Sequence, residues 1–381
     1  MTIINIFTLI LIGSNFICTQ ARGSSFIYFN FTNSKNFNNT IFSHTNLSLI
    51  NPHAFLPCLK ETCDDTLGCF QPFLLGPRLY SLPPIAGCPE VNRKDTVRFV
   101  AISREEPHQF RNVESIRKHS KIFIYIHGLG AEYDESGNLL APLAALDSFD
   151  YSILVDWSYL SFPYTIDHII GAAPFLAQIN TVLVGRITCK FIHWLWEKKS
   201  IDPLKIYVAG YSAGASVLSG IGEWCLQRYN ILVGNFMALD LPAIPFRKSN
   251  YAVTNYTHAE VVNVIITTLA PPFPILEDLG ALFTWRIGIL EADGHCVFIL
   301  NPDQINVDMN PCNGIHSCSH WFSVVAFSAA LSERCVFRFS QCPFNLGTSS
   351  PLRGKTRFDC RDHPWIRRTC VATSPAPLTR C

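Results

Sequence analysis

The chain has 381 residues, of which 48% are hydrophobic and 15% are charged. That length suffices for one large domain or two ordinary ones, with a sizeable buried core. The formal net charge is +1, and a balance this close to neutral gives no argument for a nucleic-acid partner or for strong attraction to an anionic membrane surface.

The N-terminus is typical of a secretory signal peptide, which we predict over residues 1–21. Residues 3–12 form an apolar run with the length of a signal-peptide core, too short to span a bilayer. Small and polar residues follow at 18–21, where cleavage is expected. A basic segment before the apolar run is missing, and the alternative interpretation is a buried N-terminal strand or helix. The signal peptide predicts a secreted, extracellular protein.

The cysteine content agrees with export. The chain has 15 cysteines, and removing Cys18 with the signal peptide leaves 14, an even number that suits disulfides in an oxidising compartment. Residues 22–57 are rich in Asn, Ser and Thr and predict an N-terminal extension. No later apolar run is long enough for a transmembrane anchor. Four N-glycosylation sequons begin at Asn30, Asn38, Asn46 and Asn255.

Short apolar runs rich in β-branched and aromatic residues predict the strands of a core that begins near residue 58. Longer segments between them, notably 166–197 and 213–229, have helical character. This alternation indicates an α/β fold, with a mostly parallel central sheet and helices on both faces. We assign this domain to residues 58–340 and a Cys-rich tail to 341–381. The predicted strands are 97–102, 121–126, 152–155, 205–209, 235–239 and 261–267.

A candidate nucleophile lies at Gly210-Tyr-Ser212-Ala-Gly214, between a predicted strand and a predicted helix. A Ser at so sharp a turn needs a strained backbone, and flanking glycines avoid side-chain clashes there. The turn raises the hydroxyl above the strand ends. It also places the backbone N–H of Ala213 at a helix N-terminus, where it can bind an oxyanion. The structural alternative is a Gly-Ser-Gly turn without chemistry.

A second loop supports this site. The predicted strand 121–126 runs into His127-Gly128-Leu129-Gly130. Such a loop can direct the N–H of Leu129 at the same oxyanion and complete a two-donor hole with Ala213. We interpret the His127 side chain as structural, because a His after an apolar strand usually packs and hydrogen-bonds locally.

These motifs resemble the pancreatic lipase family of α/β-hydrolases. The resemblance implies an α/β-hydrolase fold, a disulfide Cys63–Cys69, and a catalytic triad of Ser212, Asp240 and His320 in the chain order expected for that fold. Further matching segments, in chain order, are KETCDDTLGCF at 60–70, VRFVAISRE at 97–105, VDW at 155–157, NTVLVG at 180–185, ALDLPAIPF at 238–246, HAEVVNVIITT at 258–268, GHCVFILN at 294–301 and CSH at 318–320.

The predicted elements support the choice of acid. Asp240 ends an apolar run, so it lies at the carboxyl edge of a strand, where α/β sites form. Asp156 also ends a predicted strand and is the competing acid. The structural alternative for Asp240 is a capping residue in the following turn.

Among twelve histidines, His320 is the candidate base that the resemblance implies. It lies between a Cys-bounded loop and the predicted apolar helix 321–331, where a loop could carry the imidazole to Ser212. His316 and His295 are the competing histidines.

The loop before His320 bears on the substrate. In the family that the chain resembles, a disulfide-bounded lid lies here and is long in triacylglycerol lipases. Cys312 and Cys318 enclose only five residues, too few for an amphipathic helix that covers an apolar cleft. This short lid resembles the branch with phospholipase A-1 activity. The long apolar segment 269–293 is the alternative lid.

Departures from the family pattern lead to expectations about metal binding and about the C-terminal region. Val297 stands where the family usually carries Asp, and Asn255 and His258 stand where family members with calcium sites have acids. Losing carboxylates weakens a site for a hard cation. We expect no metal and no cofactor. Only 61 residues follow His320, so we also expect no C-terminal PLAT-type sandwich domain.

The sequence therefore predicts a secreted lipid carboxylester hydrolase that releases the sn-1 fatty acid of phospholipids through a Ser-His-Asp acyl-enzyme mechanism. Its partner would be a phospholipid or other acyl lipid at a membrane or micelle interface. Two alternatives stay open. One is a triacylglycerol or galactolipid lipase, and the other is a non-catalytic lipid-binding relative of the yolk-protein type, which the presence of all three triad residues argues against.

Overall fold

The computed structural model describes residues 17–21, 24–28, 61–71, 73–74, 86–129, 137–161, 173–242, 254, 256–268, 294–300, 316–332, 338–341 and 369–372. Contacts within the chain separate two units, Met1–Asn51 and Pro52–Cys381. In the first unit, β1 (Ile17–Ala21) and β2 (Ser24–Tyr28) form an antiparallel pair. The sequons and most of the predicted signal peptide and extension lie outside the described residues, so these stay predictions.

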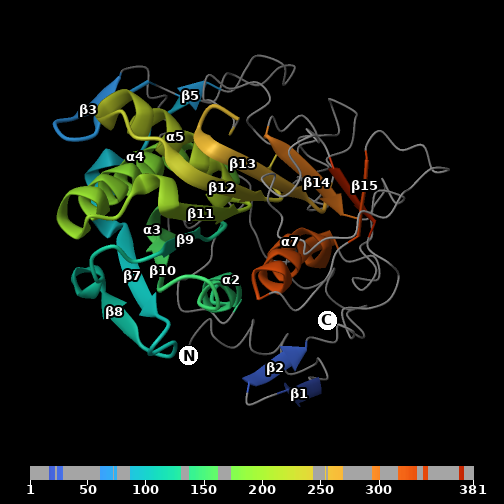
Figure 1. The fold of residues 1–381 in the computed structure, drawn as a ribbon. Helices are drawn as coiled ribbons and strands as arrows, with labels where there is room; N and C mark the ends of the chain where they lie inside the picture. The colour runs from blue at the N-terminus through green and yellow to red at the C-terminus, as the bar shows by residue number, and fades with distance from the viewer. Residues whose placement is uncertain are drawn as a thin grey trace, which may run out of the picture. The chain divides into compact units, whose positions relative to one another are not determined.

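A ten-stranded sheet organises the second unit (Figure 1). The strands lie in the order β15-β16-β14-β13-β12-β11-β9-β10-β7-β8. Every pairing from β10 across to β16 is parallel, whereas β7, β8 and β15 pair antiparallel towards the edges. In the same order, the strands are Arg338–Gln341, Thr369–Ala372, Cys296–Leu300, Ala259–Ile266, Val233–Leu239, Ile206–Tyr211, Ile122–Ile126, Tyr151–Asp156, Arg98–Ser103 and Phe110–Asn112.

The six predicted strands are β7 and β9 to β13, and each end lies within two residues of its prediction. The sheet also extends beyond what the patterns indicated. Strand β16 lies in the segment predicted as a Cys-rich tail, yet it pairs in parallel with β14. Two small hairpins precede the sheet in sequence, β3 (Thr62–Asp64) with β4 (Gly68–Phe70) and β5 (Phe73–Leu74) with β6 (Ala86–Gly87).

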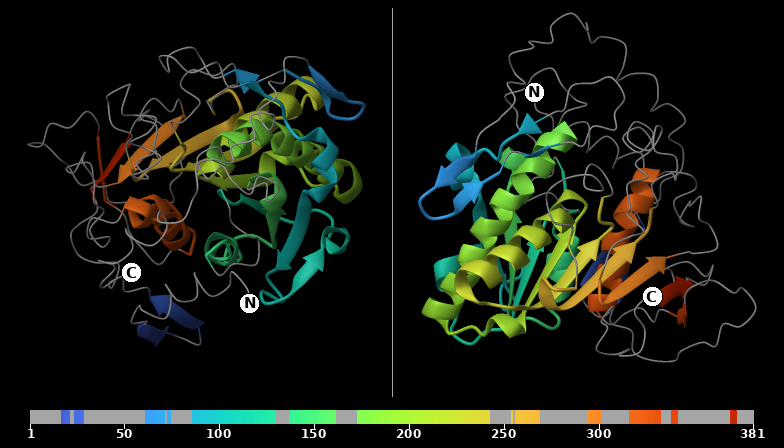
Figure 2. Two further views of the ribbon diagram at one scale, coloured as in Figure 1. Left: turned by 180° about the vertical axis from the view of Figure 1, so that it is seen from behind. Right: turned by 90° about the horizontal axis from the view of Figure 1, so that it is seen from above.

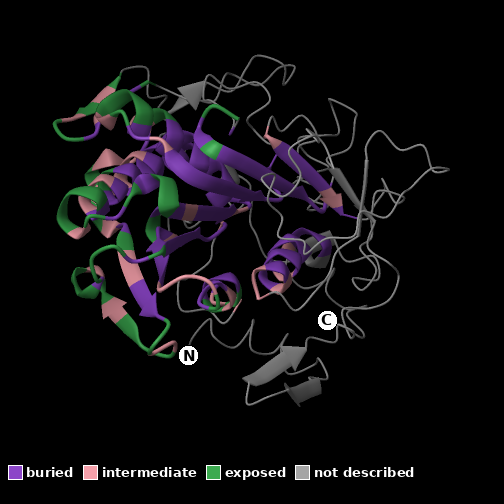
Figure 3. Ribbon diagram, viewed as in Figure 1, coloured by how far each residue is buried: buried purple, intermediate pink, exposed green. Residues whose placement is uncertain are grey.

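The central strands are apolar along their whole length because both faces of the sheet are covered. In β9, Ile122, Ile124 and Ile126 belong to one hydrophobic cluster. Phe123 and Tyr125, which alternate with them, belong to a second cluster. Side chains alternate between the faces of a strand, so the two clusters are the two cores on either side of the sheet. Figure 3 shows most of the central strands as buried, and β9 and β12 are buried along their whole length.

Helices cover both faces, as predicted (Figure 2). The first core receives side chains from α4 (Ala173–Lys199) and α5 (Ala213–Tyr229). The second receives them from α2 (Leu140–Ala145) and α7 (His316–Leu331). Short turns connect these elements, namely α3 (Ser158–Ser161), η3 (Val91–Thr96), η4 (Val113–Ser115) and η5 (Pro203–Lys205).

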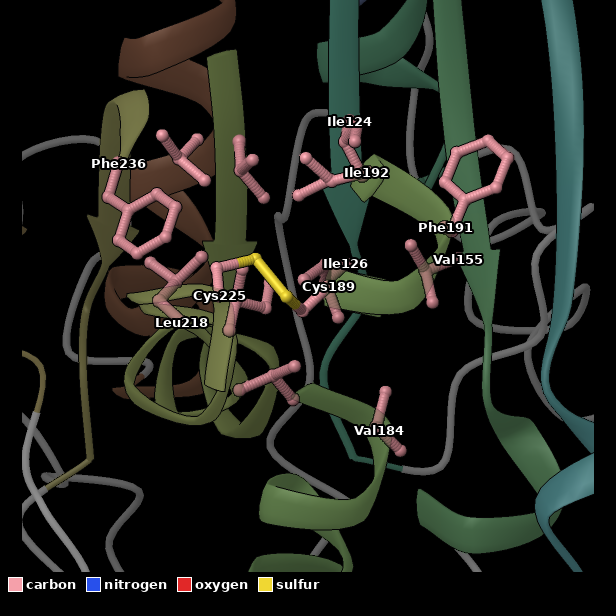
Figure 4. Close-up of a cluster of buried hydrophobic side chains, with 14 of the residues drawn as sticks. Ile124, Ile126, Val155, Val184, Cys189, Phe191, Ile192, Leu218, Cys225 and Phe236 are labelled. Carbon is pink, nitrogen blue, oxygen red and sulfur yellow. A yellow bond between two sulfur atoms is a disulfide. The ribbon is translucent and has the colours of Figure 1, made fainter. Parts of the chain in front are cut away.

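Helices α4 and α5 pack closely because small residues meet at their crossing. A Cβ added to Gly185 would lie 2.7 Å from the carbonyl carbon of Gly220, so no larger residue fits there without moving a backbone. The disulfide Cys189–Cys225 joins the same two helices within the first core (Figure 4). The disulfide holds α5, which begins directly after the candidate nucleophile Ser212, against α4.

The predicted disulfide Cys63–Cys69 is confirmed and closes the β3–β4 hairpin. Arg186 of α4 fixes this hairpin by donating hydrogen bonds to the carbonyl oxygens of Leu67 at 2.7 Å and Cys69 at 2.9 Å. Its guanidinium also stacks over the rings of Phe70, at 4.1 Å, and Trp224, at 4.2 Å. Cation–π contacts of this kind add to the bonds in holding the hairpin.

The strand order reverses at β9. From β9 the chain crosses to β10 on one side, and it then returns to form β11 on the other side. Where two neighbouring strands send their following connections in opposite directions, the sheet has a topological switch point. Ligands of open α/β sheets bind at the carboxyl ends of the strands at such a point. In this protein that switch point lies between the carboxyl ends of β9 and β11, so the topology predicts a ligand site there.

Candidate active site

Ser212 lies at the carboxyl end of β11, at the turn into α5. Its backbone has φ 53° and ψ −123°, a conformation that costs free energy for any residue with a side chain. The Ser212 N–H donates to the Leu239 carbonyl at 2.9 Å, and the Ser212 carbonyl accepts from Ala215 at 2.9 Å. These bonds hold the strained turn. The strand, the Ser212 turn, the helix and the parallel sheet together make an α/β-hydrolase fold.

The two glycines of the motif are required by close contacts rather than by their own torsion angles. A Cβ on Gly210 would lie 2.2 Å from the carbonyl oxygen of Gly214. A Cβ on Gly214 would lie 2.3 Å from the carbonyl oxygen of Ile126 and 2.5 Å from that of His127. The turn at Ser212 therefore packs directly against the end of β9, which brings the two predicted loops together.

His127 holds the loop that carries Leu129. Its Nδ1 lies 2.9 Å from the Gly128 carbonyl oxygen, and its Nε2 accepts from the Trp157 backbone N–H at 3.2 Å. The indole N–H of Trp157 returns a bond to the His127 carbonyl at 2.9 Å. His127 is fully engaged locally, in agreement with its interpretation as a structural residue.

The two predicted oxyanion donors come from adjacent segments. Ala213 is the first residue of α5, and N–H groups in a first helical turn have no acceptor within the helix. Leu129 ends the described part of the β9 loop. Gly128, the residue before it, approaches Ser212 so closely that an added Cβ would lie 3.1 Å from the Ser212 Cβ. The geometry thus places both segments next to Ser212.

Asp240 is fully buried at the carboxyl end of β12 and has a positive φ of 48°. Its Oδ1 accepts from the backbone N–H groups of Thr267, at 2.8 Å, and Thr268, at 3.0 Å. Its Oδ2 accepts from the Thr268 hydroxyl at 2.6 Å and lies 2.6 Å from Nδ1 of His320. A buried carboxylate is stable only when it is paired and hydrogen-bonded in this way.

His320 lies inside helix α7, which begins at His316. The sequence patterns predicted a helix that begins at 321, with His320 between that helix and the preceding loop, and that part of the prediction is wrong. The run of small and polar residues before Trp321 is helical, so the imidazole is held by a helix and is not carried by a loop. Packing by α7 against the second core fixes the position of the ring.

The two ring nitrogens of His320 differ in their hydrogen bonding. A carboxylate can only accept, so Nδ1 of His320 carries the hydrogen in the bond to Asp240. Nε2 is buried and has no hydrogen-bond partner among the described residues. The ring of Tyr211, the residue before Ser212, lies 4.7 Å from the imidazole, centroid to centroid, and meets Trp321 edge-on at 5.2 Å. The unpartnered nitrogen therefore belongs to a ring held beside the serine turn.

The competing acid is engaged elsewhere. Asp156 pairs across the sheet with Arg98, whose Nε lies 2.9 Å from Oδ2, and it accepts from the Ser158 hydroxyl at 2.8 Å. Burial would raise the pKa of Asp156, but His127, Ser158 and Arg98 together lower it to about 2. Asp156 is a structural ion-pair partner on the far side of β9, and His320 meets Asp240 instead.

Of the competing histidines, His295 lies away from the acid. Its Nδ1 accepts from the backbone N–H of Val262, which lies inside β13, whereas Thr267 and Thr268 follow the carboxyl end of that strand. The side chain of His316 lies outside the described residues.

Two buried side chains have shifted pKa values, Tyr211 beside the site and His258 just before β13. Burial, reinforced by the charge of Asp240, raises the pKa of the Tyr211 hydroxyl well above its usual value. Burial lowers the pKa of His258 to about 4, so this side chain is neutral at physiological pH.

In the described part of the chain, one group, formed by Glu61, Cys63 and Cys69, has the spacing of metal ligands. Its cysteines form a disulfide, and a disulfide offers no thiolate.

The predicted lid disulfide is not tested. Cys312 and the alternative lid 269–293 lie outside the described residues, and only the backbone of Cys318 is described, within α7. The disulfide Cys312–Cys318 and the alternative lid 269–293 therefore stay predictions. Among the described residues, no helix combines the length and apolar character needed to cross a bilayer.

The chain is similar to a curated human protein. No protein-family model matches the chain. Human pancreatic lipase-related protein 3 is 26% identical over 255 residues, which are 64% of this chain and 49% of that protein. The chain thus spans about half the length of the curated relative it matches.

The chain is also similar to solved structures of hydrolases. A homologue of an alpha-beta serine hydrolase from Coxiella burnetii is 12% identical, with a TM-score of 0.32 over 58% of this chain and 88% of that one. A hyperthermophilic esterase from Pyrobaculum calidifontis is 16% identical, with a TM-score of 0.31 over 64% of this chain and 86% of that one. The fold class stated above follows from the order and direction of the strands.

Several residues around the site were not singled out from the sequence. Thr267 and Thr268 follow β13, and the pairing of β13 with β12 brings them to the carboxyl edge beside Asp240, but no local pattern in the sequence contains that pairing. Tyr211 stood inside the serine motif. No sequence signal connects Trp157 to His127, because that contact depends on the register of β9 with β10.

Proposed function

We propose that this protein is a secreted serine carboxylester hydrolase with Ser212, His320 and Asp240 as its catalytic triad. The observation that carries the proposal is the buried Asp240–His320 pair, which leaves Nε2 of the imidazole unpartnered beside the Ser212 turn. A nucleophile, a base and an orienting acid are recognised as a triad by geometry and role, and this arrangement supports such a triad.

The mechanism follows from the protonation of each group. Nε2 of His320 takes the proton from the Ser212 hydroxyl as its oxygen attacks an ester carbonyl, and it then gives that proton to the departing alcohol. Asp240 stabilises the imidazolium and fixes the ring. The N–H groups of Leu129 and Ala213 bind the oxyanion of the tetrahedral intermediate. Water then hydrolyses the acyl-enzyme through the same groups, so no metal or cofactor is needed.

For the substrate, we propose the sn-1 acyl chain of phospholipids presented at a membrane or micelle interface. Support comes from the five residues between Cys312 and Cys318, which are too few for a helical lid over an apolar cleft. Similarity to a pancreatic lipase-related protein supports an acyl-lipid substrate in general.

A triacylglycerol lipase is the second candidate. The apolar segment 269–293 favours it, because a long apolar lid suits a neutral fat. A galactolipid lipase would be a variant of this candidate. A non-catalytic lipid-binding role is third and would leave the strained serine turn and the paired imidazole without a purpose.

The deciding experiment compares acyl release from phosphatidylcholine, labelled separately at the sn-1 and sn-2 chains, with release from triolein. We expect preferential release of the sn-1 label. Faster hydrolysis of triolein would replace the phospholipid proposal with the second candidate. The Ser212→Ala variant is the control for both substrates, and its turnover should fall by about 10⁶ as in comparable triads.

Secretion is a separate part of the proposal and has its own test. Export through the signal peptide would yield a mature chain that begins near residue 22. N-terminal sequencing of protein from the medium of producing cells measures this directly. Retention inside the cell with residues 1–21 intact would contradict it.

A further inference from the structure

Two consecutive threonines follow β13 and face the carboxylate of Asp240. Both are buried, with 2% of Thr267 and 1% of Thr268 exposed. Their backbone N–H groups donate to Oδ1 of Asp240 at 2.8 and 3.0 Å. The two side chains differ. The Thr268 hydroxyl donates to Oδ2 at 2.6 Å, whereas the Thr267 hydroxyl is buried without a hydrogen-bond partner among the described residues.

Oδ2 of Asp240 is therefore shared by two donors from different elements. One is the Thr268 hydroxyl after β13, and the other is Nδ1 of His320 on α7, also at 2.6 Å. Rotation of the carboxylate would break the bonds to both oxygens at once. The backbone donors hold Oδ1, and the hydroxyl is the further contact that holds Oδ2 where the imidazole meets it.

We propose that Thr268 is a positioning residue, whose hydroxyl orients the Asp240 carboxylate so that Oδ2 faces His320. The inference rests on the proposed triad and adds a residue to it. Thr268 acts through Asp240 and His320 and needs no contact with substrate. A hydroxyl in this place matters because small errors in the orientation of a catalytic group lower the rate steeply.

The neighbouring threonine provides a matched comparison. Thr268→Val and Thr267→Val each replace a buried hydroxyl by a methyl group of similar size and keep the backbone N–H. Only the first removes a bond to Asp240. Thr268→Ser keeps the hydroxyl and removes a methyl group, so it separates loss of the bond from loss of packing.

The experiment measures kcat and KM of the full chain for hydrolysis of p-nitrophenyl butyrate and of sn-1-labelled phosphatidylcholine. For Thr268→Val we expect kcat to fall about 10- to 100-fold with KM within about twofold of the wild-type value. Thr268→Ser should recover most of the lost kcat. Thr267→Val should keep a kcat at least about tenfold above that of Thr268→Val.

Folding is checked by circular dichroism and by the urea midpoint of each variant. If Thr268→Val does not fold, Thr268→Ala and Thr267→Ala replace the pair, with the same ratio expected between them. A wild-type kcat in the folded Thr268 variant would overturn the inference. Equal losses in the Thr267 and Thr268 variants would also overturn it, because packing would then explain both.

Failure of the inference is distinguishable from failure of the proposed function. The wild-type protein and Ser212→Ala are measured in the same assay. If only the wild-type protein hydrolyses the ester while Thr268→Val matches it, the triad stands and the role of Thr268 is wrong. If the wild-type protein and Ser212→Ala are equally inactive, the proposed function fails and the positioning role fails with it.

Discussion

The Nδ1 atom of His320 lies 2.6 Å from Oδ2 of Asp240, although 80 residues separate them in the chain. Strand β12 delivers the acid to the carboxyl edge of the sheet, and α7 delivers the imidazole from the second core. Both side chains are buried. The contact therefore exists only when the sheet and the helices on that face are assembled, and the following predictions depend on it.

Replacing Asp240 by Asn tests the orienting role of the acid. The amide can turn a donor towards Nδ1, which favours the wrong imidazole tautomer, so kcat should fall about 10⁴-fold. Asp156→Asn is the matched control, because Asp156 contacts Arg98 rather than His320. Its kcat should fall less than about tenfold. Equal losses in both variants, measured with a soluble ester, would refute the assignment of the acid.

Asp156 should instead contribute to stability in a pH-dependent way. Its pKa is about 2 in the folded protein against an ordinary 3.8, so its carboxylate favours the folded state by about 2 kcal/mol above pH 4 or so. This contribution is lost as the pH falls towards 2. The difference in unfolding free energy between the wild-type protein and Asp156→Asn, from urea titrations, should shrink over this range. A difference that stays constant would contradict the shift.

Trp157→Phe tests the support of the oxyanion loop. The substitution removes the indole N–H that bonds to the His127 carbonyl at 2.9 Å and leaves that carbonyl unsatisfied. Leu129 lies two residues further on, so kcat should fall about tenfold with little change in KM. Trp194→Phe in α4 is the control, since Trp194 packs against Phe191 away from this loop. A larger effect on KM than on kcat would point to substrate binding instead.

The two described disulfides should differ in their effect on stability. Cys189–Cys225 closes a separation of 36 residues, and Cys63–Cys69 closes one of 6. Longer loops lose more chain entropy when cross-linked. Replacing the first pair by alanines should therefore lower the unfolding free energy by about 4 kcal/mol, and replacing the second by about 2 kcal/mol. Urea unfolding of both double variants measures this, and the reverse order would contradict it.

The sequence allowed the central strands and both main helices to be predicted, because their apolar patterns are local. Helix α5 matches its prediction of 213–229 at both ends. The order of the strands could not be predicted, since it depends on pairing between distant segments. Strand β16 is an example: its few residues lie in a Cys- and Arg-rich segment, and they form a strand by pairing with β14 on one side and β15 on the other.

The candidate site was predictable to a similar extent. Ser212 and its glycines follow from local geometry, and the structure adds that Gly214 touches the end of β9. The choice between Asp240 and Asp156 was left to motif order, because both end apolar strands. Thr268 was missed because its importance comes from the register of β13 beside β12, which no local pattern contains.

Covalent labelling tests the central claim most directly. A fluorophosphonate reacts with a serine only when a neighbouring base activates the hydroxyl. After treatment of the wild-type protein, we predict that mass spectrometry will locate one adduct on the peptide that contains Ser212, with labelling slowed sharply in His320→Ala and Asp240→Asn. No adduct on Ser212 in the folded wild-type protein, or equal labelling in all three proteins, would contradict the account.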